Sequence, residues 1–345
     1  MRYYVCDFET SVYPGQKSTE VWAAARVEIN TEDVVLYNSI SSFWLWLETL
    51  RNKNIVYFHN GAFDFSYILD YLLKRGDYKQ ATYTPDGAIE HTKFMDVHDM
   101  PEKSMIYSIS DMGQWYTLTV KTCRGIIEFR DSYKLIPLSV AAMGDSFNTK
   151  HRKSTIEYVG ERHAGYIMTP EEEKYIANDV LVVKEAIEFM FADGHKKLTI
   201  GACCMAEYKS GYVKAEYDEM FPNLYSFTID PNIYGSCNAD EYIRKAYRGG
   251  WCYVVKGKEA KTYYNGITLD VNSLYPSMMH SDSGNFYPVG KPYFFSANSY
   301  SYVKSVYDKH ESGGEIFYYV RFRCRFHIRK GFLPFVQLKK NLYYR

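Results

Sequence analysis

The sequence predicts a mixed α/β fold, and three observations point to it. Hydrophobic residues make up 46% of the 345 residues, which is enough to bury a core and argues against global disorder. Segment 2–10 (RYYVCDFET) is rich in β-branched and aromatic residues, as strands are, and segments 18–29 and 33–39 are expected to be its antiparallel neighbours. Segment 63–76 has the apolar spacing of an amphipathic helix and ends at a glycine, which commonly follows the last helical residue.

Further strands and helices alternate along the first part of the chain. A long helix is expected over 170–191, because Thr169 suits the N-cap, Pro170 suits the first helical position, and glutamates follow in the first turn. Strands followed by strand–helix units predict an α/β or α+β domain over 1–195. The other elements expected in this domain are a helix at 43–51 and strands at 54–60, 105–109 and 126–130.

The second half of the chain has a different character. Turn-forming residues become frequent, and a second domain is expected over 196–282, followed by a loop-rich and then β-rich segment over 283–345. Asn265-Gly266 stands between two β-rich arms, which predicts a two-residue hairpin turn with Asp270 on the second arm.

Charge and cysteine content bear on the class of protein. The formal net charge is zero, so overall charge does not indicate a nucleic-acid binder, although segment 321–330, Lys339, Lys340 and Arg345 form a basic end. That end is either a solvated strand face or a face that contacts phosphates. The seven cysteines include no C-x-x-C pair, which argues against a zinc site and a disulfide framework. No stretch has the apolar length of a membrane span or signal peptide, so a cytoplasmic location is expected.

Four carboxylates and a tyrosine stand where they could meet. Asp7 and Glu9 are two positions apart on a predicted strand, so their side chains point to the same face. Asp64 follows a buried strand at the start of a helix, and Tyr175 and Asp179 share a helix face. Converging carboxylates repel each other unless cations lie between them, and oxygen ligands alone suit Mg²⁺ or Mn²⁺. Two such ions about 3.5–4 Å apart promote phosphodiester hydrolysis.

Each of these signals is weak when taken alone. A D-x-E pair on a strand is usually exposed on the surface, and Asp64 could simply cap its helix. Tyr175 with Asp179 is most often an ordinary helix face, and Asn60 could equally be a turn residue. The order of the segments changes the odds, because D-x-E on the first strand is followed by N-x-x-x-D after an apolar strand and by Y-x-x-x-D on a late helix.

These segments, DFET at 7–10, HNGAFD at 59–64 and YIAND at 175–179, resemble the three exonuclease motifs of family B DNA polymerases. The resemblance implies a ribonuclease H-like 3′–5′ exonuclease domain with two Mg²⁺ or Mn²⁺ ions in its active site. It implies that Tyr175 orients the attacking water. The metal ligands implied are Asp7, Glu9, Asp64 and Asp179, and the residues that hold the 3′ end of single-stranded DNA are Thr10, His59, Asn60 and Phe63.

Two further segments resemble motifs of the protein-primed polymerases of small bacteriophages. DSYKLIP at 131–137 is similar to a Ser/Thr-Leu-x-x-apolar segment, which implies that Ser132 binds single-stranded DNA, although Tyr133 stands where the motif has leucine. KSTIEY at 153–158 is similar to a Lys-x-x-apolar motif. That similarity implies that Lys153 approaches the scissile phosphate, where a compact cation suits the transition state.

The resemblance extends into the polymerase domain. YRGG at 247–250 is similar to the Y-x-G-G segment between exonuclease and polymerase domains, which implies DNA contacts by Tyr247, Arg248, Gly249 and Gly250; a bare Gly-Gly turn is the other interpretation. LDVNSLYPSMM at 269–279 is similar to palm motif A. This similarity implies that Asp270 and the Val271 carbonyl bind the catalytic metals and that Tyr275 binds the incoming nucleotide.

The resemblance also implies partners and a limit. The expected partners are single-stranded and primer-template DNA, deoxynucleotides and a terminal protein primer, and 283–345 resembles the start of the insertion that contacts that primer. No second palm carboxylate motif follows Asp270, so polymerisation is expected only with a second polypeptide that carries the rest of the palm. The alternatives are a DNA- or terminal-protein-binding module without chemistry and a stand-alone nuclease, against which the palm motif argues. For a viral protein, the expected location is the host cytoplasm.

Overall fold

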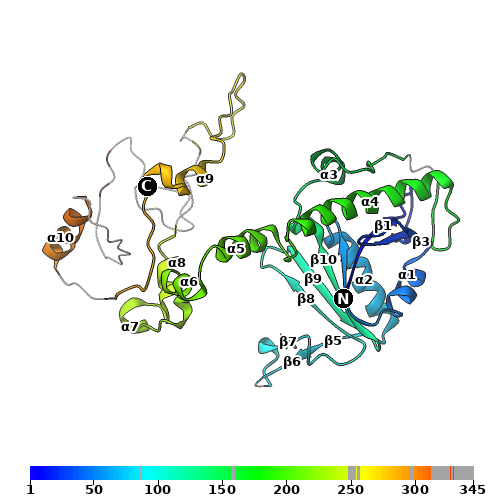
Figure 1. Cartoon of the computed structure of the whole chain (residues 1–345), viewed down its shortest axis with the longest axis horizontal. Coiled ribbons are helices and arrows are strands. Elements are labelled where there is room, and N and C mark those ends of the chain that lie inside the picture. Colours follow the sequence, from blue (N-terminus) through cyan, green and yellow to red (C-terminus); the bar gives the residue numbers. More distant parts are fainter. Residues whose placement is uncertain are drawn as a thin grey trace. The chain divides into compact units, whose positions relative to one another are not determined.

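A mixed eight-stranded sheet organises the first part of the chain in the computed structural model (Figure 1). The strands follow one another across it in the order β3-β2-β1-β4-β10-β9-β8-β5. They are β1 (Arg2–Thr10), β2 (Val21–Glu28), β3 (Val35–Tyr37), β4 (Asn52–Phe58), β5 (Lys79–Gln80), β8 (Ser104–Ile109), β9 (Trp115–Lys121) and β10 (Gly125–Asp131). Strands β6 (Thr82–Tyr83) and β7 (Lys93–Phe94) form a separate antiparallel pair. The predicted α/β class is confirmed.

The structure describes residues 1–85, 87–156, 160–247, 254, 257–294, 299–311, 327 and 329. The chain divides into two compact units, Met1–Tyr208 and Lys209–Arg345, and each is described by itself. Among the helices described, none is long and apolar enough to cross a bilayer.

The central strands of the sheet run parallel. β1 pairs with β4 and β4 pairs with β10 in the same direction, so the carboxyl ends of all three strands meet at one edge. β2 is antiparallel to β1, as predicted, whereas β3 pairs with β2 instead of β1. At the carboxyl edge the register of β1 shifts between Glu9 and Thr10, which marks a bulge, and bulges often re-aim side chains beside active sites.

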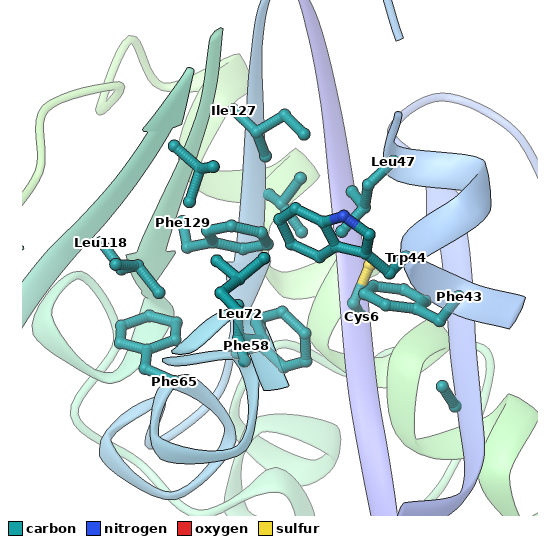
Figure 2. Close-up of a cluster of buried hydrophobic side chains, with 14 of the residues drawn as sticks. Cys6, Phe43, Trp44, Leu47, Phe58, Phe65, Leu72, Leu118, Ile127 and Phe129 are labelled. Carbon is teal, nitrogen blue, oxygen red and sulfur yellow. The ribbon is translucent and has the colours of Figure 1, made fainter. Parts of the chain in front are cut away.

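Helices cover both faces of the sheet and create two cores. Helices α1 (Ile40–Leu47) and α2 (Ala62–Arg75) pack on one face, and α3 (Val140–Ser146) and α4 (Pro170–Ala192) pack on the other. Alternation along β1 divides its side chains between the cores. Figure 2 shows the first core, in which rings of α1, α2 and the sheet interlock; it includes Cys6, Phe43, Trp44, Leu47, Phe58, Phe65, Leu72, Leu118, Ile127 and Phe129.

Local signals in the sequence fix the ends of α2 and α4. Gly76 has a left-handed φ of 74°, and its N–H donates to the Leu72 carbonyl at the end of α2. Before α4, the Thr169 hydroxyl accepts the backbone N–H of Glu172 at 3.3 Å, and the Glu172 carboxylate accepts the N–H of Thr169 at 2.8 Å. This reciprocal capping box starts α4 at the predicted residue.

The unit Lys209–Arg345 contains mainly short helices in its described residues. The predicted hairpin at Asn265-Gly266 is absent, because no strand lies in the described segment 257–294. Two strands alone are marginally stable, and the described residues of this unit offer no sheet for them to join.

The short elements not yet named come from both units. The remaining α-helices are α5 (Ile200–Ser210), α6 (Lys214–Met220), α7 (Pro231–Tyr234), α8 (Ala239–Arg244), α9 (Leu274–Met279) and α10 (Tyr300–Glu311), and the 3-10 turns are Ile89–His91, Ser132–Lys134, Leu224–Ser226 and Ser281–Ser283.

Candidate active site

Three of the predicted carboxylates meet at the carboxyl edge of the central strands. Ligand oxygens of Asp7, Glu9 and Asp179 lie within 4.8 Å of one another. Asp7 and Glu9 share a face of β1 with Val5, which packs in the core under α4. Asp179 is buried on α4 itself. Strand alternation and one helix face therefore aim the three side chains at a common point.

Asp64 approaches the same point from the start of α2. It is buried directly after the turn that follows β4, and its charge acts on Asp7 strongly enough to raise the pKa of that carboxyl. A fifth carboxylate, Asp131 at the end of β10, acts in turn on Asp64. Sequence analysis did not name Asp131 as a site residue, although it directly follows the strand expected at 126–130 and opens the segment DSYKLIP.

Burial and mutual repulsion disfavour the ionised forms of these acids. Burial raises the pKa of Asp7 well above its usual value, and repulsion from Asp64, Glu9 and Asp179 raises it further. Burial also raises the pKa of Asp64 and of Asp179. In the described part of the chain, Oδ1 of Asp64 and Oδ1 of Asp179 are buried without a hydrogen-bond donor. A divalent cation would supply the missing partner, so these residues fit Mg²⁺ or Mn²⁺.

Lys153 brings a positive charge into the group. Its ammonium donates to Oδ2 of Asp179 and lies 5.5 Å from the centre of the Tyr175 ring. Burial alone would lower the pKa of Lys153, but the hydrogen bond and the attraction to Asp179 outweigh burial and raise it. The side chain stays 34% exposed, so the ammonium can reach both the buried acids and a molecule in the cleft.

A cavity of about 230 Å³ opens onto these groups. A water molecule occupies about 30 Å³ in the liquid, so the cavity has room for several waters or for ions and a phosphate group. Its polar lining comes from Asp7, Glu9, His59, Lys153, Tyr175 and Asp179.

The turn between β4 and α2 exposes two of the predicted DNA-binding residues. Asn60 has a left-handed φ of 60°, so it is a turn residue, and its side chain remains exposed. Phe63 is 48% exposed, and its ring meets the ring of Tyr67 edge-on at 5.1 Å. Thr10 is partly buried at the β1 bulge, next to Glu9.

His59 and Ser132 hold the strand ends together. Nε2 of His59 lies 2.8 Å from the Leu138 carbonyl oxygen, to which it donates, and Nδ1 lies 3.0 Å from Oγ of Ser132. Burial lowers the pKa of His59. Oγ of Ser132 also lies 3.0 Å from the carbonyl oxygen of Phe58.

Ser132 is fully buried where β10 ends beside β4, and its role in binding single-stranded DNA stays a prediction. Its neighbour Tyr133 is 41% exposed and lies edge-on to His59 at 5.5 Å between ring centres. Of the two, Tyr133 has the more exposed side chain.

The predicted palm residues are not gathered into a site. Asp270, Val271 and Tyr275 are exposed in the unit Lys209–Arg345, and the Val271 carbonyl accepts the N–H of Leu274 at 3.3 Å. The acidic group that could hold a metal among the described residues does not include Asp270. Tyr247 is exposed; Arg248, Gly249, Gly250 and most of 321–345 lie outside the described residues.

Comparison with known sequences places these observations in a family. The chain matches the family described as DNA polymerase type B, organellar and viral, over residues 48–164 and 158–345. The DNA polymerases of Bacillus phages B103 and phi29 are each 29% identical to it over 350 residues, which cover 99% of this chain. The DNA polymerase of Streptococcus phage Cp-1 is 26% identical over 357 residues. The chain spans about half the length of these relatives, 53% of each.

Solved structures of phi29 DNA polymerase are similar to the chain as well. The complex with primer-template DNA and incoming nucleotide substrates has a TM-score of 0.65 and 27% identity, and the match covers 86% of this chain and 48% of the other. The complex with single-stranded DNA has a TM-score of 0.58 and 26% identity, and the match covers 74% of this chain and 41% of the other. Because the family match covers far more than half of the residues, the chain belongs to the type B DNA polymerases of organelles and viruses.

Proposed function

We propose that the unit Met1–Tyr208 is a metal-dependent 3′–5′ exonuclease, the proofreading part of a protein-primed type B DNA polymerase. The observation that carries the proposal is the convergence of Asp7, Glu9 and Asp179 within 4.8 Å, beside buried carboxylate oxygens that lack donors. These buried oxygens belong to Asp64 and Asp179, and the D-x-E pair of Asp7 and Glu9 is itself partly buried beside them. Acids this close are unfavourable without compensating cations, which is the expected condition of a metal site in a nuclease.

The carboxylates are proposed to hold two divalent ions. Asp7, Glu9, Asp64 and Asp179 offer only oxygen ligands, which suit Mg²⁺ or Mn²⁺. When bound, such ions activate a water for attack on the phosphodiester and stabilise the leaving oxygen. The protein contributes two rigid elements, β1 and α4, that keep the ligand oxygens in place before substrate arrives.

Tyr175 and Lys153 complete the proposed chemistry. Tyr175 lines the cavity one helical turn before Asp179, where its hydroxyl would orient the attacking water. The Lys153 ammonium would bond an oxygen of the scissile phosphate and stabilise the charge that grows there in the transition state. Its partner in the structure, Asp179, keeps the ammonium directed into the cleft.

The 3′ end of single-stranded DNA is proposed to cross the turn between β4 and α2. Phe63 and Tyr133 expose aromatic rings on which bases can stack, and the exposed amide of Asn60 can bond the DNA backbone. Thr10 would contact the terminal nucleotide beside Glu9. His59 and Ser132 would act indirectly, by holding the ends of β4 and β10 in register. The similarity to a phi29 polymerase complexed with single-stranded DNA supports this substrate class.

The unit Lys209–Arg345 is proposed to contribute to a polymerase site. Asp270 and the Val271 carbonyl would bind metal there, Tyr275 would contact the incoming deoxynucleotide, and 247–250 would contact primer-template DNA. The support is the family membership and the similarity to a polymerase complexed with primer-template DNA and nucleotides. A terminal protein primer is a proposed partner on the family resemblance alone.

The nuclease is tested with the whole 345-residue chain and a single-stranded oligonucleotide labelled at its 5′ end. With Mg²⁺ or Mn²⁺ the label should move into a ladder of fragments shortened from the 3′ end, and excess EDTA should stop the reaction. Cleavage that persists in EDTA, or that releases the 5′ label first, would sink the proposal. DNA retention without any ladder would favour a binding module that lacks chemistry.

A further inference from the structure

Three hydrogen bonds hold the segment before Lys153 against α4. Glu185 of α4 takes part in all of them: its Oε1 lies 2.5 Å from Nδ1 of His151, and its Oε2 accepts the backbone N–H of Lys150 at 2.5 Å and that of His151 at 3.4 Å. The side chains of His151 and Glu185 are only 22% and 14% exposed. We call this contact the Glu185 clamp. It joins residues 34 positions apart in the sequence.

The segment held by the clamp is stiff up to the residue before Lys153. The Thr149 hydroxyl donates to the His151 carbonyl at 2.7 Å. The Arg152 guanidinium donates to the Thr149 hydroxyl at 2.9 Å and to the His151 carbonyl at 3.0 Å. The Arg152 chain also packs on α3, where a Cβ on Gly144 would lie 3.2 Å from Arg152 Cδ. These bonds link residues 149–152 to one another, so a displacement of the backbone at the clamp should displace all four residues together.

One helix thus fixes both ends of Lys153. Asp179 of α4 accepts a hydrogen bond from the ammonium, and Glu185 accepts the backbone N–H groups of Lys150 and His151, three and two residues before the lysine. The two acids lie roughly 9 Å apart along the helix, at 1.5 Å per residue. The ammonium stands at the end of a flexible four-carbon stem, so the Lys153 backbone sets the range of positions that it can reach, and Asp179 selects one of them.

We propose that Glu185 is a positioning residue for the exonuclease, which sets Lys153 against the scissile phosphate through His151 and Lys150. The proposal rests on the proposed nuclease function and extends it to a residue outside the cavity lining. Glu185 acts through the lysine and touches neither substrate nor metal. Its loss should therefore affect the rate of the chemical step and leave binding of DNA unchanged.

Glu188 offers a matched control on the same helix. Its Oε1 accepts the backbone N–H of Asn30 at 2.6 Å, which is the same kind of helix-to-loop bond. The loop that contains Asn30 carries no residue of the acidic group. Its Glu32 does lie 3.5 Å from the Lys150 ammonium, but both side chains are more than half exposed, so this ion pair contributes little. If packing of loops onto α4 were all that mattered, Glu185→Ala and Glu188→Ala should act alike.

The test measures kcat and KM for removal of nucleotides from single-stranded DNA by the whole chain with Mg²⁺. Glu185→Ala should lower kcat roughly 10- to 100-fold, the range expected when a reacting group is displaced by about 1 Å, with KM unchanged. Lys153→Ala should lower kcat at least as much. The double variant should be no slower than Lys153→Ala, because the clamp has nothing left to position. Glu185→Gln keeps the shape and an acceptor oxygen, and it should recover most of the rate.

Three results would overturn the proposal that Glu185 positions Lys153. These are a wild-type kcat in Glu185→Ala, an equal loss in Glu188→Ala, or a further loss when Glu185→Ala is added to Lys153→Ala. Melting curves followed by circular dichroism show whether each variant is folded at the assay temperature. If Glu185→Ala is not, His151→Ala removes the side-chain bond to the same carboxylate and keeps the backbone bonds, so it should lower kcat by less, again with KM unchanged, and a wild-type kcat in His151→Ala would then overturn the proposal. Absence of metal-dependent cleavage by the wild-type chain would contradict the proposed function itself, which separates the two failures.

Discussion

The two units carry equally recognisable motifs in very different surroundings. In Met1–Tyr208, Asp7 and Asp179 project from a strand and a helix that are packed into a continuous core. In Lys209–Arg345, Asp270 is exposed on irregular backbone, and the buried residues among those described are only Ser236, Ala239 and Asp240. The difference teaches that a motif becomes a site when a core aims its side chains at one point and removes them from water.

Burial also explains why acids of the first unit repel one another strongly, whereas Asp270 in the second unit is exposed to water. The packed edge of the sheet raises the pKa of Asp7, Asp64 and Asp179, because it desolvates acids that also repel one another. Such an arrangement costs stability and persists only where the framework holds it in place.

The largest expected difference between the units concerns packing. Phe58 is fully buried and packs edge-on against Phe8 at 4.9 Å, so Phe58→Ala should lower the free energy of unfolding by about 3–5 kcal/mol. Leu274, in the segment that resembles palm motif A, is 46% exposed, and Leu274→Ala should change the free energy of unfolding by less than about 0.5 kcal/mol. Guanidinium unfolding followed by circular dichroism measures both. A comparable loss in the two variants would show that the second unit has a core of its own around motif A.

A smaller effect is expected at the exposed aromatic face of the first unit. Stacking of a base on an aromatic ring is worth about 1–3 kcal/mol, so Phe63→Ala should raise KM for single-stranded DNA roughly 5- to 150-fold. The change in kcat should be small, because Phe63 lies outside the acidic group. Leu73→Ala is the control, since Leu73 is similarly exposed on the same helix but lies near its far end. Equal KM values for the two variants would remove Phe63 from the DNA path.

The smallest effect concerns the burial of the Asp7 carboxyl and its repulsion by neighbouring acids. A carboxyl whose pKa is raised by folding binds its proton more tightly in the folded state, so the folded state loses stability as pH rises from the unfolded pKa, about 3.9, through the raised one. Asp7→Asn removes that loss. In EDTA at pH 7.5 the variant should gain about 0.5–2 kcal/mol of unfolding free energy, and the gain should vanish near pH 3.

The control for this measurement is Asp70→Asn, because Asp70 is exposed on α2 and pairs with Lys74. It should show no such pH-dependent gain. Mg²⁺ should raise the melting temperature of the wild-type chain more than that of Asp7→Asn. A variant that is less stable than wild type at neutral pH in EDTA would mean that Asp7 is not under repulsion.

Local features of the sequence predicted local features of the structure well. The capping residues of α4 and the alternation along β1 act within a few residues, so the aim of Asp7 and Glu9 to one face could be predicted from spacing. Strand β9 was not among the predicted elements. The Asn265-Gly266 hairpin was wrong because a turn signal needs neighbouring strands to pair against, and no local pattern reports them.

Long-range features could not be predicted in the same way. The burial of Ser132 follows from the parallel pairing of β10 with β4, which brings together residues 74 positions apart. The contact between His151 and Glu185 has the same character, because nothing in either local sequence points to the other. The family resemblance named the acids of the site, but it could not show that the palm residues would stand exposed.

The central claim, that a nuclease site lies in the first unit and does not depend on the second, is tested most directly by two variants measured side by side. In a 3′-degradation assay with Mg²⁺, the double variant Asp7→Ala/Glu9→Ala should be at least about 10³-fold slower than wild type, because two proposed metal ligands are lost. Its affinity for single-stranded DNA, measured by fluorescence anisotropy, should stay near that of wild type. Asp270→Ala should degrade DNA at the wild-type rate. Wild-type cleavage by the double variant, or loss of cleavage in Asp270→Ala, would contradict the account.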